Sequence, residues 1–159
     1  MSQSPAPTER SPFGQALHQG LSELASSKRM SAQQLEVIYA LAYAHVAQHQ
    51  YAQALPLFAF LSQYGATRKH YLSGLALCLQ MVGRYDEAIC IYSLIGTLYP
   101  DTPDAALRVA ECQLAQADTE SARAELVRVL ELAGTSGRHG QARARAQALL
   151  NLTAREAGA

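Results

Sequence analysis

The chain has 159 residues, 49% of them hydrophobic, which is enough for one domain with a buried core. Thirteen lysines and arginines balance 13 aspartates and glutamates, so the zero formal charge indicates neither direct nucleic-acid binding nor attachment to an anionic membrane. The longest strongly apolar run, residues 37–44, is far shorter than the ~20 residues that span a bilayer, which argues against membrane insertion. With no apolar signal core at the N-terminus and three scattered cysteines, we expect a cytoplasmic protein with reduced thiols.

The N-terminal part of the chain divides into a tail and a helix. Residues 1–12 are rich in proline and serine and predict a disordered tail. In residues 13–30, large apolar side chains recur at helical spacing and predict an amphipathic helix. These side chains are Phe13, Leu17, Leu21 and Leu24.

Residues 31–134 contain three copies of one pattern. Alanine recurs at two positions of each copy, and a large side chain follows the second one. The three sets are Ala42, Ala76 and Ala110; Ala54, Ala88 and Ala122; and Phe58, Tyr92 and Leu126. Small residues let two helices approach closely, and the large residue fills the space beside them. The spacing of the copies predicts an all-α fold of three tandem tetratricopeptide repeats, at 35–68, 69–102 and 103–136.

Local signals mark where the helices of this array begin and end. Ser31 followed by Gln34 predicts a capping box at the first helix. Thr102 and Pro103 predict an N-cap and a first helical residue for the third repeat. Residues 135–159 predict a C-terminal capping helix and tail, because a repeat array must cover its last apolar face.

In an array of this kind the first helix of each repeat lines a concave groove, at five positions that share one helical face. We expect the groove to bind an extended apolar segment. The predicted groove residues are Tyr39, Tyr43, Val46, His70, Ser73, Leu77, Gln80, Met81, Leu107, Glu111 and Leu114, and the remaining mapped positions hold Glu36, Ala47, Asp104 and Ala115. None of these fifteen positions holds Lys, Arg or Asn, which argues against a clamp for a C-terminal carboxylate.

The helix at 35–48 is apolar nearly all round. We expect its packing face to hold Ile38, Leu41, Ala42 and His45, which leaves Tyr39, Tyr43 and Val46 without a partner inside the repeat. Two explanations stay open. Either the N-terminal helix or a second subunit covers these side chains, or they line the groove as anchoring sites for a bound segment.

The other polar clusters in the sequence do not require a metal-binding or catalytic role. His45 and His49 have the spacing of metal ligands but no third ligand nearby, so we expect packing and surface roles. Cys78 and Cys112 occupy equivalent repeat positions, which indicates small packing residues. We therefore expect no cofactor and no enzyme. A C-terminal basic cluster predicts a solvated face, with docking to an acidic export component as the alternative. Its members are Arg138, His139, Arg143 and Arg145.

The segment GRYDEAI at 83–89 and the run Ala110-Glu111-Cys112 resemble the class II chaperones of type III secretion systems, and the similarity covers about residues 15–134. The resemblance implies that the groove holds an extended segment of a hydrophobic translocator protein and keeps it secretion-competent. It implies aromatic pocket residues at Tyr39 and Tyr43, with Val46 where an aromatic is common. Family members often form homodimers through the N-terminal region, and some co-activate transcription. A general tetratricopeptide scaffold and a transcriptional co-activator remain the alternative functions.

Overall fold

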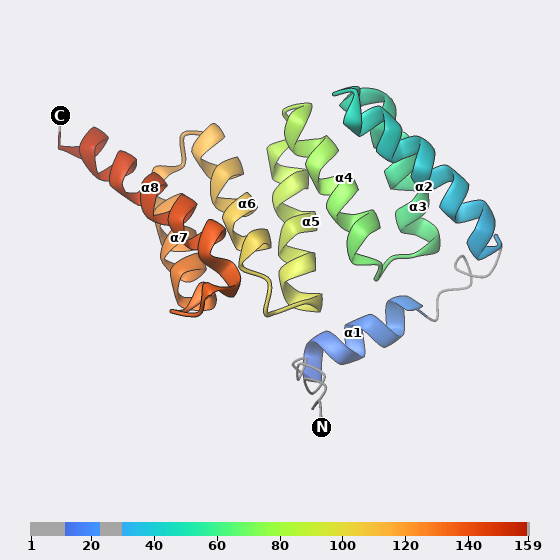
Figure 1. Cartoon of the computed structure of the whole chain (residues 1–159), viewed down its shortest axis with the longest axis horizontal. Coiled ribbons are helices and arrows are strands. Elements are labelled where there is room, and N and C mark those ends of the chain that lie inside the picture. Colours follow the sequence, from blue (N-terminus) through green and yellow to red (C-terminus); the bar gives the residue numbers. More distant parts are fainter. Residues whose placement is uncertain (1–11, 23–29, 159) are drawn as a thin grey trace.

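The computed structural model describes residues 12–22 and 30–158, which form helices and turns without any strand. Figure 1 shows the helices as consecutive pairs laid side by side along the molecule. The predicted tail and Leu24 lie outside the described residues, except that Pro12 begins the first helix. The elements are α1 Pro12–Ser22, α2 Ala32–Ala47, α3 Tyr51–Tyr64, α4 Lys69–Met81, α5 Tyr85–Leu98, α6 Pro103–Ala115, α7 Thr119–Ala133, the short 3-10 helix η2 Gly137–His139, and α8 Gly140–Ala157.

Three helix pairs, α2–α3, α4–α5 and α6–α7, form the array that the repeated pattern predicts. All six repeat alanines are fully buried between helices. The three large residues are also buried, with exposed fractions of 2%, 5% and 0% for Phe58, Tyr92 and Leu126. Because these positions recur once in every repeat, each pair packs on the next in the same way. The prediction of three tandem tetratricopeptide repeats is confirmed.

The contact between the first and second pairs depends on a glycine that the repeat pattern did not identify. A Cβ atom on Gly74 of α4 would lie 2.2 Å from Cε1 of Phe58 on α3. No side chain fits at that distance. Gly74 therefore sets how closely α4 approaches α3.

The turn inside each pair uses a left-handed backbone conformation. His49, Gly83 and Ala117 occupy the same position of successive repeats and have φ angles of 58°, 83° and 61°. A residue with a Cβ atom adopts this conformation at a cost that glycine does not have. The turn geometry is thus the same in all three repeats, with glycine at only one of the three positions.

Both predicted helix starts are present, but only one of them has a side-chain cap hydrogen bond. Ser31 Oγ accepts from Gln34 N at 3.2 Å, and Gln34 Oε1 accepts from Ser31 N at 3.0 Å, which confirms the capping box. Thr102 occupies the N-cap position of α6 and Pro103 follows it, but the Thr102 side chain makes no cap hydrogen bond. Its Oγ1 accepts instead from Nζ of Lys69 at 3.2 Å. The predicted N-cap position and the proline that follows it are therefore confirmed, and only the side-chain cap bond is absent.

The two end helices pack on different parts of the array. The C-terminal helix α8 covers α7 and α6, where Ala142 and Ala146 are buried against Leu126, so the predicted capping helix is confirmed. The N-terminal helix α1 lies against α5 (Figure 1), and half-buried Leu17 contacts the core of the second repeat. No helix in the described ranges has both the length and the apolar character that a membrane span needs.

Candidate functional site

The groove face begins at an aromatic cluster around Tyr39 of α2. The Tyr39 ring meets His70 edge-on, with centroids 4.9 Å apart, and lies 6.0 Å from Phe58 and 5.7 Å from Tyr71. Tyr39 is half-buried, and this burial is the main reason that the pKa of its phenol is raised. The expectation that Tyr39 lacks an internal partner is therefore wrong, because α3 and α4 supply aromatic neighbours. Tyr43, one turn along, is 60% exposed.

The packing face of α2 differs from the predicted one. Leu41, an expected packing residue, is 51% exposed, and Val37, one turn earlier, is 68% exposed. The buried positions are Leu35 and Ala42, with Ile38 half-buried against the same core cluster. The helix α1 packs on α5, and Val37, Leu41 and Tyr43 stay exposed to solvent.

A pocket of about 230 Å³ lies between α4 and α6. Two predicted groove residues, Ser73 and Leu77, line it. Its apolar floor comes from Tyr92 and Ile95 of α5, which are 5% and 2% exposed. This pocket can take one apolar side chain of an extended segment, since it is open on the groove side and apolar beneath.

Two of the polar groups beside this pocket are bonded to each other. The Tyr92 hydroxyl donates to Oε1 of Gln80 at 3.0 Å. Burial raises the pKa of this phenol, so it stays a neutral donor. Gln80, a predicted groove residue, therefore orients a ring of the pocket floor.

Two cations also line the pocket, Lys69 of α4 and Arg108 of α6. They directly precede His70 and directly follow Leu107, so they adjoin mapped positions without belonging to them. Their long side chains reach the groove from neighbouring positions, which the five-position map could not show. The groove therefore carries positive charge although none of the fifteen mapped positions is basic.

The C-terminal end of the groove is closed by charged groups. Leu107 is only 6% exposed and packs in one cluster with Leu126 and Ala142. Glu111 accepts from Arg108 at 3.0 Å through one oxygen and from Arg145 of α8 through the other. A second pocket of about 290 Å³ between α6 and α8 has a mostly polar lining, formed by Asp104, Leu107, Arg108, Glu111, Gln141, Ala142 and Arg145. The apolar part of the groove therefore extends from α2 to α6.

Four predicted groove residues belong neither to the aromatic cluster nor to the lining of these two pockets. Val46 is half-buried and packs against the core of the first repeat, so the expectation that it lacks an internal partner is also wrong. Leu114 is half-buried, and Gln80 supports Tyr92 from the side. Met81 is 51% exposed at the end of α4. The structure thus brings the predicted residues into an aromatic region, a central pocket and a charged end rather than one uniform surface.

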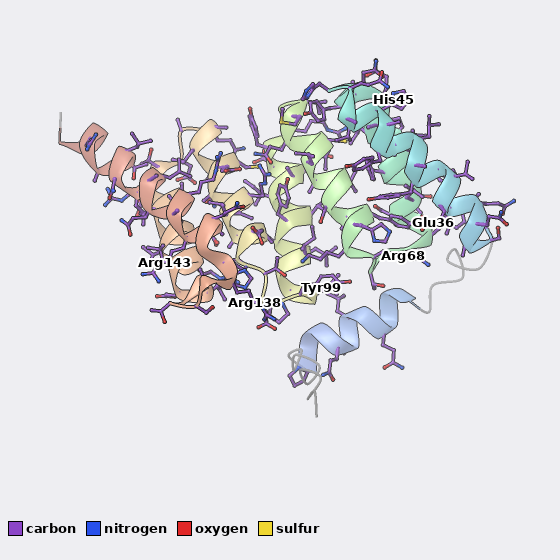
Figure 2. The ribbon with its side chains drawn as sticks, in the orientation of Figure 1. Glu36, His45, Arg68, Tyr99, Arg138 and Arg143 are labelled. Carbon is purple, nitrogen blue, oxygen red and sulfur yellow. The ribbon has the colours of Figure 1, made fainter. Side chains whose placement is uncertain are left out.

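The aromatic region also carries a titratable group. His70 is exposed as a residue, but partial burial of its ring is the main cause that lowers its pKa. Arg68 lowers the pKa further, and Glu36 opposes both effects. Figure 2 shows Glu36 and Arg68 on the same side of the molecule. His70 therefore stays neutral more readily than an exposed histidine.

The remaining polar candidates are held by local contacts. His45 Nδ1 lies 2.7 Å from Gln50 Oε1, and His49 Nδ1 lies 2.9 Å from the Tyr51 hydroxyl. Cys78 and Cys112 are buried in the core, which raises the pKa of each thiol to about 11. Within the described part of the chain, no three His, Cys, Asp or Glu side chains gather as a metal site.

The predicted basic cluster is divided by the structure. Arg145 pairs with Glu111 in the groove, whereas Arg143 donates to the carbonyl oxygen of Gly134 at 2.6 Å and holds the end of α7. Figure 2 shows Arg138 and Arg143 at the turn between α7 and α8, away from α2 and α4. Arg143 and Arg145 therefore make separate contacts, at the end of α7 and in the groove.

Comparison with known proteins relates this chain to tetratricopeptide repeats. The family model described as tetratricopeptide repeat matches residues 79–148. Among curated proteins, low calcium response locus protein H of Yersinia pestis is 28% identical over 109 residues, which are 69% of this chain. That match spans 65% of the relative's own length, slightly less than two thirds.

Solved structures agree with this relationship. The structure of PcrH from Pseudomonas aeruginosa is 27% identical, with a TM-score of 0.72 over 82% of this chain and 99% of that one. The Yersinia enterocolitica type III secretion chaperone SycD, in complex with a peptide of the translocator YopD, is 25% identical. Its TM-score is 0.74 over 81% of this chain and 98% of SycD.

Proposed function

We propose that this chain, a tetratricopeptide-repeat protein related in sequence and structure to the translocator chaperones of type III secretion systems, binds an extended apolar segment of a hydrophobic translocator in its groove. The proposal is carried by one observation. The open pocket between α4 and α6 has an apolar floor and lies beside an aromatic region on the same face. Related structures support it, because SycD and PcrH are described in complexes with segments of YopD, PopD and PopB.

Each part of the groove has a distinct role in this binding. Tyr39, Tyr43 and His70 offer ring faces to an anchor at one end, and Tyr and His keep a polar atom toward water. Leu77, with Ser73 beside it, receives an apolar side chain at the centre. The other proposed groove residues, which position these or contact the backbone of the segment, are Val46, Gln80, Met81, Leu107, Glu111 and Leu114.

The physical benefit of such binding is solubility of the cargo. A pore-forming protein has apolar segments that aggregate in water unless they are covered. A groove that binds the unfolded segment biases the cargo toward the covered form by mass action, without any energy source. This role places the chain in the cytoplasm, where the cargo waits before export. A homodimer through the N-terminal helix remains a prediction from the family resemblance.

Capture of the tagged chain from its native cells, followed by mass spectrometry, tests the proposal. We expect a secreted, membrane-active protein with the wild type that is lost from the variant Tyr43→Glu/Leu77→Glu. The matched control is Val127→Glu, which changes an exposed apolar residue of α7 outside the groove and should retain the cargo. Circular dichroism checks that all three proteins are folded.

The alternative functions predict different results in the capture experiment, in a reporter assay and in a solubility assay. A scaffold would bring down folded partners that the double variant retains, and this would overturn the proposal. A co-activator would change the output of a reporter promoter even when the cargo gene is deleted. A groove chaperone should instead keep a co-expressed cargo in the supernatant after centrifugation, and the double variant should not.

A further inference from the structure

The central pocket combines an apolar floor with a positively charged rim. Leu77, Tyr92 and Ile95 form the apolar side, and Lys69 and Arg108 approach from α4 and α6. An apolar anchor needs only the floor. The two cations therefore require a separate explanation.

The ammonium group of Lys69 has hydrogen-bond donors available for a ligand. Its Nζ donates to the neutral Oγ1 of Thr102 at 3.2 Å and lies 5.6 Å from the centre of the Tyr99 ring. Among the described residues no carboxylate lies within ion-pair distance of this ammonium group. An ammonium group has three donors. The threonine hydroxyl and the ring face therefore hold Lys69 beside the pocket without neutralising its charge.

Arg108 is only partly neutralised. Its guanidinium shares the carboxylate of Glu111 with Arg145, one oxygen each. The Arg108 side chain is 47% exposed, so some of its five donors are available to a ligand. Asp104 adds one negative charge to the same lining. Three cations, Lys69, Arg108 and Arg145, thus face two carboxylates, and one positive charge remains at the pocket.

We infer that Lys69 and Arg108 bind the side-chain carboxylate of an aspartate or glutamate that lies next to the apolar anchor in the bound segment. This inference rests on the proposed function and adds a selectivity to it. The preferred segment is then apolar with an acidic neighbour, not merely apolar. An internal carboxylate fits an extended chain that continues past the pocket in both directions, whereas a terminal carboxylate would end it.

A displayed library of random nonapeptides, selected on the folded full-length protein, provides the test. From the wild type we expect peptides in which Asp or Glu stands within two residues of a large apolar residue, above its frequency in the unselected library. Lys69→Gln/Arg108→Gln should still select apolar peptides but lose the acidic preference. The matched control is Arg123→Gln/Arg155→Gln, which removes two exposed positive charges outside the groove and should keep the preference.

Synthetic peptides then give the magnitude. The most enriched peptide, labelled and amidated at its C-terminus, should bind the wild type about fivefold more tightly than its Glu→Gln counterpart, as expected for a partly exposed ion pair. This ratio should shrink in high salt and approach one in the double variant. The same Gln peptide with a free C-terminal carboxylate should not regain the affinity.

Each other outcome has a definite meaning. Apolar peptides without any acidic enrichment, or an equal enrichment from the double variant, would overturn the carboxylate inference and leave the proposed function intact. Recovery of affinity by the free C-terminus would replace the internal carboxylate with a terminal one and overturn the inference as stated. If none of the proteins enriches apolar peptides, the groove does not bind extended segments. That result would overturn the proposed function itself, and the carboxylate inference with it.

Discussion

Gly74 controls the closest approach between the first two repeats. Replacing it with alanine puts a methyl group against the ring of Phe58, 2.2 Å away. We expect Gly74→Ala to lower the free energy of unfolding by about 2 kcal/mol through overpacking. Urea unfolding followed by circular dichroism measures the change. Gly96→Ala is the matched control, because Gly96 lies inside helix α5 and a Cβ atom added there would meet open space. This variant should raise the free energy of unfolding by about 0.5–1 kcal/mol. An unchanged free energy of unfolding in Gly74→Ala would show that α3 and α4 can separate freely.

His70 should make stability depend on pH. Burial lowers the pKa of His70 below its usual value of 6.5, so the unfolded chain takes up this proton more readily than the folded one. The contribution of neutral His70 to the free energy of unfolding is complete above pH 6.5. It is lost as the pH falls through and below that value. We expect the free energy of unfolding to drop less between pH 7.5 and 5.5 in His70→Gln than in the wild type. Equal drops in both proteins, measured by urea unfolding, would contradict this assignment.

Some contacts of single residues could be predicted from the sequence, and others could not. The capping pair Ser31 and Gln34 was predictable because its partners are close in the chain and depend on little else. The hydrogen bond between Lys69 and Thr102 was not predictable, because it joins the start of α4 to the residue before α6, 33 positions further along the chain. This distant cation competes for the threonine hydroxyl that local rules assign to the helix cap. Long side chains at the edge of a face need coordinates before they can be placed in a groove.

The repeated left-handed turn offers a test of strain at the level of the helix pair. Ala117 adopts φ of 61° where Gly83 stands in the preceding repeat. We expect Ala117→Gly to raise the free energy of unfolding by about 0.5–1 kcal/mol, since relief of ~1–2 kcal/mol of strain exceeds the added freedom of the unfolded chain. Gly83→Ala should have the opposite effect. Thermal unfolding of both variants gives the comparison, and shifts in the same direction would refute the explanation.

Helix α2 shows why the apolar pattern of one element can mislead. Its sequence is apolar nearly all round, so no stripe indicates which side meets the repeat. Leu41, expected inside, is exposed, whereas Tyr39, expected without an internal partner, contacts rings from α3 and α4. The later first helices, α4 and α6, have a neighbour on each side, and the repeat register predicted their buried alanines correctly. The first helix of an array has neighbouring helices on one side only, and the repeat pattern does not show this asymmetry.

At the scale of the whole molecule, α8 should be essential for keeping the last repeat closed. Ala146 is fully buried against α6 and α7. We expect Ala146→Glu to lower the free energy of unfolding by about 3 kcal/mol or more, because it places an unpaired charge in the interior. Ala148→Glu, at an exposed position of the same helix, should be nearly neutral. Urea unfolding and binding of an apolar dye report on both, and equal effects would show that α8 is not a packed cap.

The global architecture was largely readable because the array is built from contacts between neighbours. A constant repeat length fixes which helices pair and how each pair meets the next, so three repeats and a C-terminal cap followed from spacing alone. The position of α1 did not follow. An amphipathic stripe states that a helix packs against something, but not against which of several apolar surfaces, and α1 packs on α5 rather than on the adjacent pair.

The placement of α1 has a consequence for how the chain folds. The main contacts among the described helices join elements that are neighbours or next neighbours in the chain, and such local contacts form quickly. The contact between α1 and α5 instead spans the whole first repeat and requires closure of a long loop. The array should therefore assemble first and α1 should dock last, so that substitutions at Leu17 accelerate unfolding while leaving the refolding rate nearly unchanged.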